Sequence, residues 1–346
     1  MARMGLKVAV YGGSGYTGGE LLRLLSGHPE VGGIEVSSRQ HAGKVVGDVY
    51  PELAVRETFV EAGEIDGSSL DVAFVAYPHM ESAGLVKELL AAGTRLVVDL
   101  SADFRLPDVA MYEEWYGPHP APELLEEAHY GLPEVFGSPE GGRLVANPGC
   151  YPTAAILALA PVVKRIAVSS VSVNALSGVS GAGAKPTQKS HFVSANENVS
   201  PYGVSGGAPR HRHTPEIETM LRRFAPGTPN VTFVPHLLPI SRGELETIYV
   251  DLPEGAELPG AGDVLGWFAE DYDGWAFVEG RPEVPQISHV VGTNRARLSV
   301  AVDERAGRLV LFSALDNLLK GASGAAVQNM NLALGYAETA GLEYLR

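Results

Sequence analysis

A glycine-rich turn between a strand-like and a helix-like segment constrains the fold of this chain more than any other feature. Residues 7–12 (KVAVYG) form a short, valine-rich run that ends in glycine, as buried parallel strands do. The turn Gly12 to Gly18 (GGSGYTG) follows, and a helical pattern through Leu21 and Leu25 then closes at Gly27. Such a strand–turn–helix start predicts a parallel sheet with helical crossovers.

The same alternation continues through the first hundred residues. We expect strands at residues 33–38, 71–77 and 95–100 and a helix at residues 82–92. An α/β fold with a doubly wound parallel sheet is therefore predicted.

The pattern changes around Cys150. A helix is expected from Pro152, a strand at 171–176, a helix at 215–224, and antiparallel strands at 247–252, 296–302 and 308–314. The last helical pattern, at 322–337, returns to the first domain in our interpretation.

Composition excludes several classes of protein. The 346 residues allow two domains, and a net charge of −15 argues against a nucleic-acid binder. No apolar run reaches the length of a membrane span, and the chain start leaves no room for a signal peptide. A single cysteine cannot form an internal disulfide, so we expect a cytoplasmic protein.

The glycine turn carries the pattern of a dinucleotide-binding loop. Glycines allow a tight turn and a close approach of the backbone to a pyrophosphate, whose charge lies at the helix N-terminus. Where an NAD site usually has an acidic residue at the end of the second strand, this chain has Ser37, Ser38 and Arg39. Hydroxyls and a guanidinium suit a 2′-phosphate, which favours NADP.

The stretch around Cys150 (NPGCYPTA) predicts a nucleophile. Pro152 suits the first position of a helix, which would place Cys150 just ahead of the helix N-terminus. Backbone N–H groups and the helix dipole would favour the thiolate there.

Two histidines, His211 and His213, precede a Thr-Pro helix start in PRHRHTPE and could supply an acid/base group. They lack a third ligand at a recognisable spacing, so no metal site is expected. Cationic candidates for holding a substrate phosphate or carboxylate are Arg105, Lys185 and Arg242. Asp316 and Asn317, just ahead of Leu318, are candidates for a helix cap or for a contact to the nicotinamide end of a cofactor.

Taken in order, the motifs resemble those of the N-acetyl-γ-glutamyl-phosphate reductase family of arginine biosynthesis, which is related to aspartate-semialdehyde dehydrogenases. The resemblance covers nearly the whole chain through GGSGYTG, SSR, SADFRL, YGLPE, NPGCYPTA, SGVSGAGAK, HRHTPEI, PHLLPISRG, GTN and DNLLKGASGAAVQNMN.

This resemblance implies a Rossmann-type NADP-binding domain at 1–149, rejoined by a C-terminal helix at 322–346. A central α+β catalytic and oligomerisation domain at 150–321, with a mixed or antiparallel sheet, would make a dimer or tetramer. Cys150 matches the family's nucleophile. The family's acid/base histidine corresponds to His213 or His211, with His213 favoured. The implied cofactor contacts are Gly12, Ser14, Gly15, Tyr16, Thr17, Gly18, Ser37, Ser38, Arg39 and Asn317.

The expected activity is the NADPH-dependent reduction of N-acetyl-L-glutamyl 5-phosphate to the semialdehyde through a Cys150 thioester. One alternative is a related reductase of carrier-linked 2-aminoadipate 6-phosphate, whose cysteine segment resembles AGCNATA rather than NPGCYPTA. The aspartate-semialdehyde branch is disfavoured because Ser241 to Thr247 (SRGELET) has no histidine. A non-catalytic NADP sensor is a further alternative, in which Cys150 would be inert.

Overall fold

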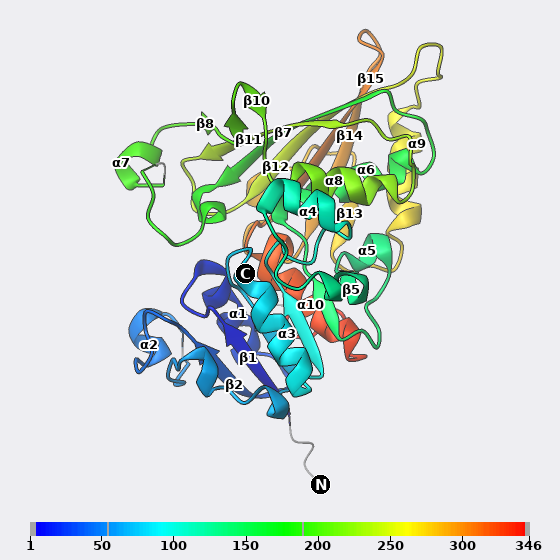
Figure 1. The fold of residues 1–346 in the computed structure, drawn as a ribbon. Helices are drawn as coiled ribbons and strands as arrows, with labels where there is room; N and C mark the ends of the chain where they lie inside the picture. The colour runs from blue at the N-terminus through cyan, green and yellow to red at the C-terminus, as the bar shows by residue number, and fades with distance from the viewer. Residues whose placement is uncertain (1–4, 54, 189, 343–346) are drawn as a thin grey trace. The chain divides into compact units, whose positions relative to one another are not determined.

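The computed structural model describes residues 5–53, 55–188 and 190–342. It divides into two compact units, one formed by the described parts of Met1–Pro148 and Ala322–Leu345 and the other by Gly149–Gly321. Each unit has its own sheet (Figure 1). No helix in the described part of the chain is long and apolar enough to cross a membrane.

The first unit contains a six-stranded parallel sheet in the order β2-β1-β3-β4-β6-β5. Its strands are β1 (Leu6–Tyr11), β2 (Val31–Ser37), β3 (Val72–Val75), β4 (Leu96–Asp99), β5 (Ala128–Tyr130) and β6 (Leu144–Ala146). The four residues of β3 and of β4 are all buried, which explains why these strands show as continuous apolar runs in the sequence.

Helices cover both faces of this sheet. The chain passes from β1 through α1 (Tyr16–Ser26) to β2 on one side, and from β3 through α3 (Ser82–Ala92) to β4 on the other side. Because such connections are right-handed, α1 and α3 lie on opposite faces of the sheet. Shorter helices are α2 (Val46–Val49), α4 (Val109–Tyr116) and α5 (Pro133–Phe136). The doubly wound parallel fold predicted from the sequence is confirmed.

The last helix, α10 (Gly324–Ala333), packs against α1 and β4 within the first unit. Its buried amides bind main-chain and side-chain groups far away in the sequence. Asn329 donates through Nδ2 to the carbonyl of Gly131 at 2.8 Å and to Oδ1 of Asn147 at 3.1 Å. These bonds satisfy buried polar groups and so fix the position of the helix in the unit. The helix is shorter than the predicted 322–337, because a π-helical turn (Leu319–Ser323) replaces its first residues and a turn at Leu334 and Gly335, where φ is +77°, ends it.

The second unit contains a seven-stranded mixed sheet in the order β13-β14-β15-β12-β7-β11-β8. Its strands are β7 (Ser170–Gly178), β8 (Ser200–Pro201), β11 (Val231–Leu238), β12 (Glu244–Asp251), β13 (Val278–Gly280), β14 (Ala296–Asp303) and β15 (Arg308–Leu315). β7 and β11 run parallel, whereas β12 is antiparallel to both β7 and β15. A separate ribbon pairs β9 (Val204–Ser205) with β10 (Ala208–Pro209).

Three helices of the second unit pack on this sheet and on each other. α6 (Cys150–Val163) contacts β12, β14 and β15, and α8 (Thr214–Arg222) and α9 (Ala261–Asp271) pack beside it. A short helix, α7 (Phe192–Ala195), precedes the small ribbon. Every residue of α6 after its first is buried, so the unit encloses the body of this helix while Cys150 at its start stays partly accessible.

Candidate active site

The glycine loop has the geometry that a dinucleotide site requires. Gly12 has a φ of +83°, which favours glycine, and Gly15 is the N-cap of α1. A Cβ on Gly18 would lie 2.4 Å from the carbonyl oxygen of Gly12, so the helix start packs directly against the turn. Without side chains at these positions, the backbone N–H groups at the start of α1 remain accessible to an anion, which fits a pyrophosphate.

The end of β2 is tied to this loop. Ser14 Oγ and Ser38 Oγ are hydrogen-bonded at 2.8 Å, and the N–H of Gly13 donates to the Ser37 carbonyl at 2.9 Å. Arg39 lies just beyond, ion-paired through Nη1 to Glu81 Oε2 at 2.7 Å. Loop and strand end therefore form one continuous group of candidate cofactor contacts, which includes Tyr16 and Thr17 at the start of α1.

Arg39 is a cation that stays accessible to a ligand. Its side chain is 64% exposed, and its guanidinium lies 4.9 Å from the centre of the Tyr77 ring. The exposed ion pair with Glu81 contributes little stability, because water and salt screen it. A 2′-phosphate can therefore compete with Glu81 for this guanidinium at small cost.

Tyr50, which follows α2, contacts the glycine loop and was not identified from the sequence. Its hydroxyl donates to the Gly15 carbonyl at 2.9 Å, and its ring would lie 2.7 Å from a Cβ on Gly19. No local pattern marks Tyr50, because it is 35 residues from the loop in sequence.

Cys150 is the first residue of α6, and Gly149 is its N-cap. The expectation that the helix begins at Pro152 is therefore wrong by two residues. The reason is that the first turn of a helix has no intrahelical use for its N–H groups, so proline fits any of its first positions. Glu216 of α8, also missed from the sequence, accepts a hydrogen bond from the Gly149 N–H at 3.1 Å and fixes the turn.

The thiol is not a resting thiolate, contrary to the expectation from its place at a helix start. Crowding by protein atoms raises the pKa of half-buried Cys150 well above its usual value, and the nearby Glu244 carboxyl raises it further. The Tyr151 N–H opposes this shift and is outweighed. Desolvation and a neighbouring acid therefore exceed the contribution of the helix N-terminus.

Both candidate histidines lie against Tyr151, the residue after the cysteine. The ring centre of Tyr151 is 5.7 Å from that of His211 and 5.8 Å from that of His213. Burial and the neighbouring Arg212 lower the pKa of His211 to about 4, so its imidazole is neutral. His211 Nδ1 accepts from the His213 N–H at 3.3 Å, which leaves its proton on Nε2.

The remaining candidates have different surroundings. Arg105 is buried and donates to the carbonyls of Asn147 (2.8 Å) and Leu100 (2.7 Å), so part of its role is to hold the segment before Gly149. Lys185 is exposed in the loop after β7. Arg242 lies 4.0 Å from Asp316.

Asp316 and Asn317 stabilise the turn that follows β15. Asp316 Oδ1 accepts from the N–H of Leu318 at 2.9 Å, so the cap expected at this point is confirmed. Asn317 accepts from the Gly243 N–H at 2.8 Å and donates to Ser180 Oγ at 2.9 Å. Asn317 therefore joins three segments of the second unit, and its expected contact with nicotinamide stays a prediction.

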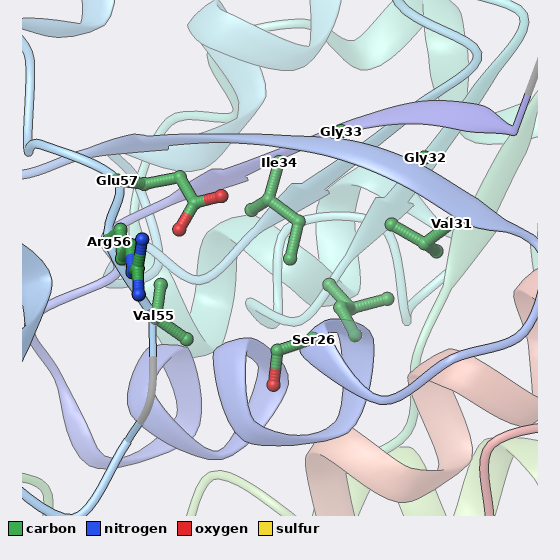
Figure 2. A pocket seen from close by; sticks show the side chains of 9 residues that line it. Ser26, Val31, Gly32, Gly33, Ile34, Val55, Arg56 and Glu57 are labelled. Carbon is green, nitrogen blue, oxygen red and sulfur yellow. The ribbon is translucent and has the colours of Figure 1, made fainter.

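A cavity of about 290 Å³ opens in the first unit between the end of α1 and the start of β2 (Figure 2). Ser26, Ile34, Arg56 and Glu57 line it. It lies near the amino end of β2, whereas the glycine loop follows the carboxyl end of β1 in the same parallel pair. Ligands of doubly wound sheets bind at the carboxyl ends, so this cavity is not the dinucleotide site.

A doubly wound unit with a glycine loop, joined in one chain to a mixed-sheet unit with a cysteine at a helix start, defines the class of dinucleotide-dependent dehydrogenases with a cysteine centre. Residues 7–140 match the family described as semialdehyde dehydrogenase, NAD binding domain. Residues 150–317 match semialdehyde dehydrogenase, dimerisation domain.

Whole-chain relatives narrow this class. The N-acetyl-gamma-glutamyl-phosphate reductase of Rubrobacter xylanophilus is 72% identical over 99% of this chain and 100% of its own length. That of Geobacter sulfurreducens is 46% identical over 98% of this chain and 99% of its own length. The chain belongs to the semialdehyde dehydrogenase family, in the branch of the N-acetyl-gamma-glutamyl-phosphate reductases.

Solved structures agree on the fold. Aspartate semialdehyde dehydrogenase II of Vibrio cholerae superposes with a TM-score of 0.73 at 20% identity, covering 96% of this chain and 99% of that one. Aspartate semialdehyde dehydrogenase of Candida albicans, solved with NADP, superposes with a TM-score of 0.63 at 19% identity, covering 96% and 99%. The Rossmann-type unit and mixed-sheet unit predicted from the sequence are confirmed.

Proposed function

We propose that this chain is a cytoplasmic, NADPH-dependent reductase that converts N-acetyl-L-glutamyl 5-phosphate to N-acetyl-L-glutamate 5-semialdehyde and phosphate in arginine biosynthesis. The observation that carries the proposal is Cys150 at the first position of α6, beside two histidines and on a turn fixed by Glu216. The whole-chain likeness to reductases named for this substrate supports it.

The thiol sulfur attacks the acyl carbon, and a C–S bond forms as the C–O bond to phosphate breaks. Bound NADPH supplies the hydride that reduces the resulting thioester. A histidine then protonates the oxygen of the tetrahedral species and takes the proton back as the C=O bond re-forms and sulfur departs.

His213 is our choice for this acid/base role. His211, with its low pKa, is neutral at working pH and fits a fixed Nε2–H donor to the same oxygen better than a proton source. Arg242 and Lys185 supply positive charge for the substrate phosphate in this scheme. Arg105 positions the chain before Gly149 through its two carbonyl bonds and is the weaker candidate for direct contact.

NADP is the cofactor in this proposal, held by the glycine loop and by Ser37, Ser38 and Arg39. The exposed guanidinium of Arg39 and the hydroxyl of Ser38 can bind a 2′-phosphate. Asn317 is proposed to contact the nicotinamide end.

The chain also has a match to a dimerisation domain over residues 150–317, and we propose that it forms a homodimer. The sheet face opposite α6 supports this, because Tyr249 of β12 is 36% exposed and lies beside half-buried Val310 of β15. An aspartate at Val310 should produce a monomer in light scattering, while an aspartate at exposed Val284 should leave the dimer intact. A monomeric wild type would refute the assembly.

The deciding experiment is the reverse reaction. Purified protein receives NADP⁺, phosphate and either N-acetylglutamate semialdehyde or the aminoadipate or aspartate analogue. We expect NADPH to form with N-acetylglutamate semialdehyde and little to form with the other two. A preference for the aminoadipate compound would assign the alternative substrate, and inactivity with all three would refute a reductase.

A further inference from the structure

Two fully buried carboxyl groups, Glu244 and Glu246, lie at the start of β12. They alternate along the strand, so both point to the face that α6 covers, in line with buried Ile248 and Val250. None of their four oxygens has a hydrogen-bond partner among the described residues. Native proteins rarely bury such groups without a partner, and those they keep require an explanation beyond packing.

The register of β12 against its two neighbouring strands shows which residues lie beside the two carboxyls. Glu244 lies between Ser177 of β7 and Leu315 of β15, and the neighbours of Glu246 at the same level are Ala175 and Ser313. Neither pair offers a cation. Among the described residues, the ionisable groups that interact electrostatically with Glu244 include Cys150, Tyr151, Tyr202, Glu246 and Asp316.

Cys150, the first residue of the covering helix, is the group that faces Glu244. The two side chains interact electrostatically, and Glu244 raises the pKa of the thiol, although no hydrogen bond joins them in the structure. Glu246 lies two residues further along the strand and interacts with Glu244. Glu244 is thus the carboxyl that interacts with the thiol across the face that α6 covers, and Glu246 is a second buried carboxyl further along the same strand.

Burial raises the pKa of Glu244 to about 8, and burial together with the charge of Glu244 raises that of Glu246 well above its usual range. One proton of this pair of acids is therefore exchanged near working pH, and Glu244 is the member of the pair that interacts with the thiol. A base is most effective when its pKa lies near the operating pH. Because the carboxyls of Glu244 and Glu246 are coupled, the first proton lost near pH 8 belongs to this pair of acids rather than to either group.

We propose that Glu244 is the proton acceptor for the Cys150 thiol, a role that rests on the reaction proposed above. As the S–H bond breaks, an O–H bond forms on Glu244, and the sulfur electron pair makes the C–S bond while phosphate leaves with the C–O pair. When the reduced adduct collapses, the C–S bond breaks, sulfur keeps the electron pair, and Glu244 returns the proton to it. Glu244 ends the cycle as it began.

This role is separate from that of the histidines. His211 and His213 contact the ring of Tyr151, whereas Glu244 interacts electrostatically with the thiol itself. The thiol therefore has its own proton acceptor, and the histidines remain for the carbonyl oxygen.

The test is the alkylation of Cys150 by iodoacetamide across neutral and alkaline pH, in the wild type, Glu244→Gln and Glu246→Gln. Because Cys150 is the only cysteine of the chain, all labelling reports on it. The wild-type rate should show an inflection near pH 8. Glu244→Gln should abolish the inflection, and Glu246→Gln should keep it, although both remove a carboxyl that is equally buried.

Turnover gives the second readout. Glu244→Gln should lower kcat by about 10²–10⁴ with the KM for NADPH unchanged, and Glu246→Gln should lower it by less than about tenfold. Glu244→Asp, which keeps an acid one methylene further away, should show an inflection displaced from the wild-type pH and a reduced rate. Thermal unfolding and NADPH binding check that each variant is folded. If Glu244→Gln does not fold, the test depends on Glu244→Asp, in which the inflection of the alkylation rate must move away from the wild-type pH.

An unchanged alkylation profile in Glu244→Gln would overturn the proposal, as would equal losses of kcat in both glutamine variants. Alkylation needs no substrate, so it separates this proposal from the proposed function. An inflection that depends on Glu244, in a protein that does not reduce N-acetylglutamyl phosphate, would leave the acid–thiol pair standing and reject only the substrate.

Discussion

Gly321 and Cys150 pack so closely that a Cβ on Gly321 would lie 2.7 Å from the Cβ of Cys150 and 3.2 Å from its Cα. The turn after β15 therefore presses on the first residue of α6. Any side chain on Gly321 must displace the cysteine or the turn, because neither neighbouring atom is the end of a flexible side chain.

Gly321→Ala should lower kcat and reduce the free energy of unfolding by about 1–3 kcal/mol, the usual cost of overpacking a dense interior. Urea unfolding and steady-state kinetics measure the two effects. Gly266→Ala is the matched control, because Gly266 lies inside α9 with open space around it and should gain about 0.5–1 kcal/mol. Equal effects of the two changes would contradict the close contact.

Cys150→Ser should remove nearly all reductase activity while leaving NADPH binding intact, because a hydroxyl in the same place is a far weaker nucleophile. Fluorescence titration with NADPH and a kcat measurement test the two halves of the statement. Activity near that of the wild type would rule out the thioester route.

His213→Asn should lower kcat by about 10²–10⁴, the usual contribution of a general acid or base. His211→Asn should cost less, because an imidazole with a pKa of about 4 carries no extra proton to donate at neutral pH. His191→Asn, at an exposed position, is the control and should have no effect. Small and equal losses for His211 and His213 would remove both from the mechanism.

Arg39→Asp should shift cofactor preference from NADPH towards NADH, because a carboxylate repels the 2′-phosphate. Glu81→Gln should have the opposite effect and tighten NADPH binding by a few-fold, since an exposed ion pair is worth about 0.2–1 kcal/mol. The ratio of kcat/KM for the two cofactors reports both changes. If the ratio does not change in either variant, Arg39 does not bind the 2′-phosphate.

The buried acids also predict how stability depends on pH. Folding raises the pKa of Glu244 from an ordinary value of 4.5 to about 8, so the folded chain holds a proton that the unfolded chain has lost across that window. Stability from this group is therefore full below pH 4.5 and falls as pH rises to about 8, by at most about 1.4 kcal/mol per unit.

Glu246, whose pKa is raised even further, adds a fall of the same sign. Glu246→Gln should thus raise the melting temperature more at pH 8 than at pH 5. Exposed Glu254→Gln should give no such difference. A Glu246→Gln curve parallel to that of the wild type would show that Glu246 does not titrate with folding.

The sequence by itself determined the features that are local. The glycine loop, the buried strands β3 and β4, the bounds of α3 and the placement of Cys150 near a helix start follow from short-range rules of backbone conformation and apolar periodicity. These rules act over a few neighbouring residues, so the amino-acid sequence alone contains the information on which they depend.

Only the tertiary structure decided the chemistry of the cysteine. The predicted strand at 247–252 began three residues late, which left Glu244 and Glu246 outside it, although their alternation with Ile248 and Val250 was a usable sign of a shared face. The register of β12 places Glu244 beneath a helix that starts 94 residues earlier in the chain. Desolvation there reverses the thiolate expected from the helix dipole, because burial depends on atoms brought together by the whole fold.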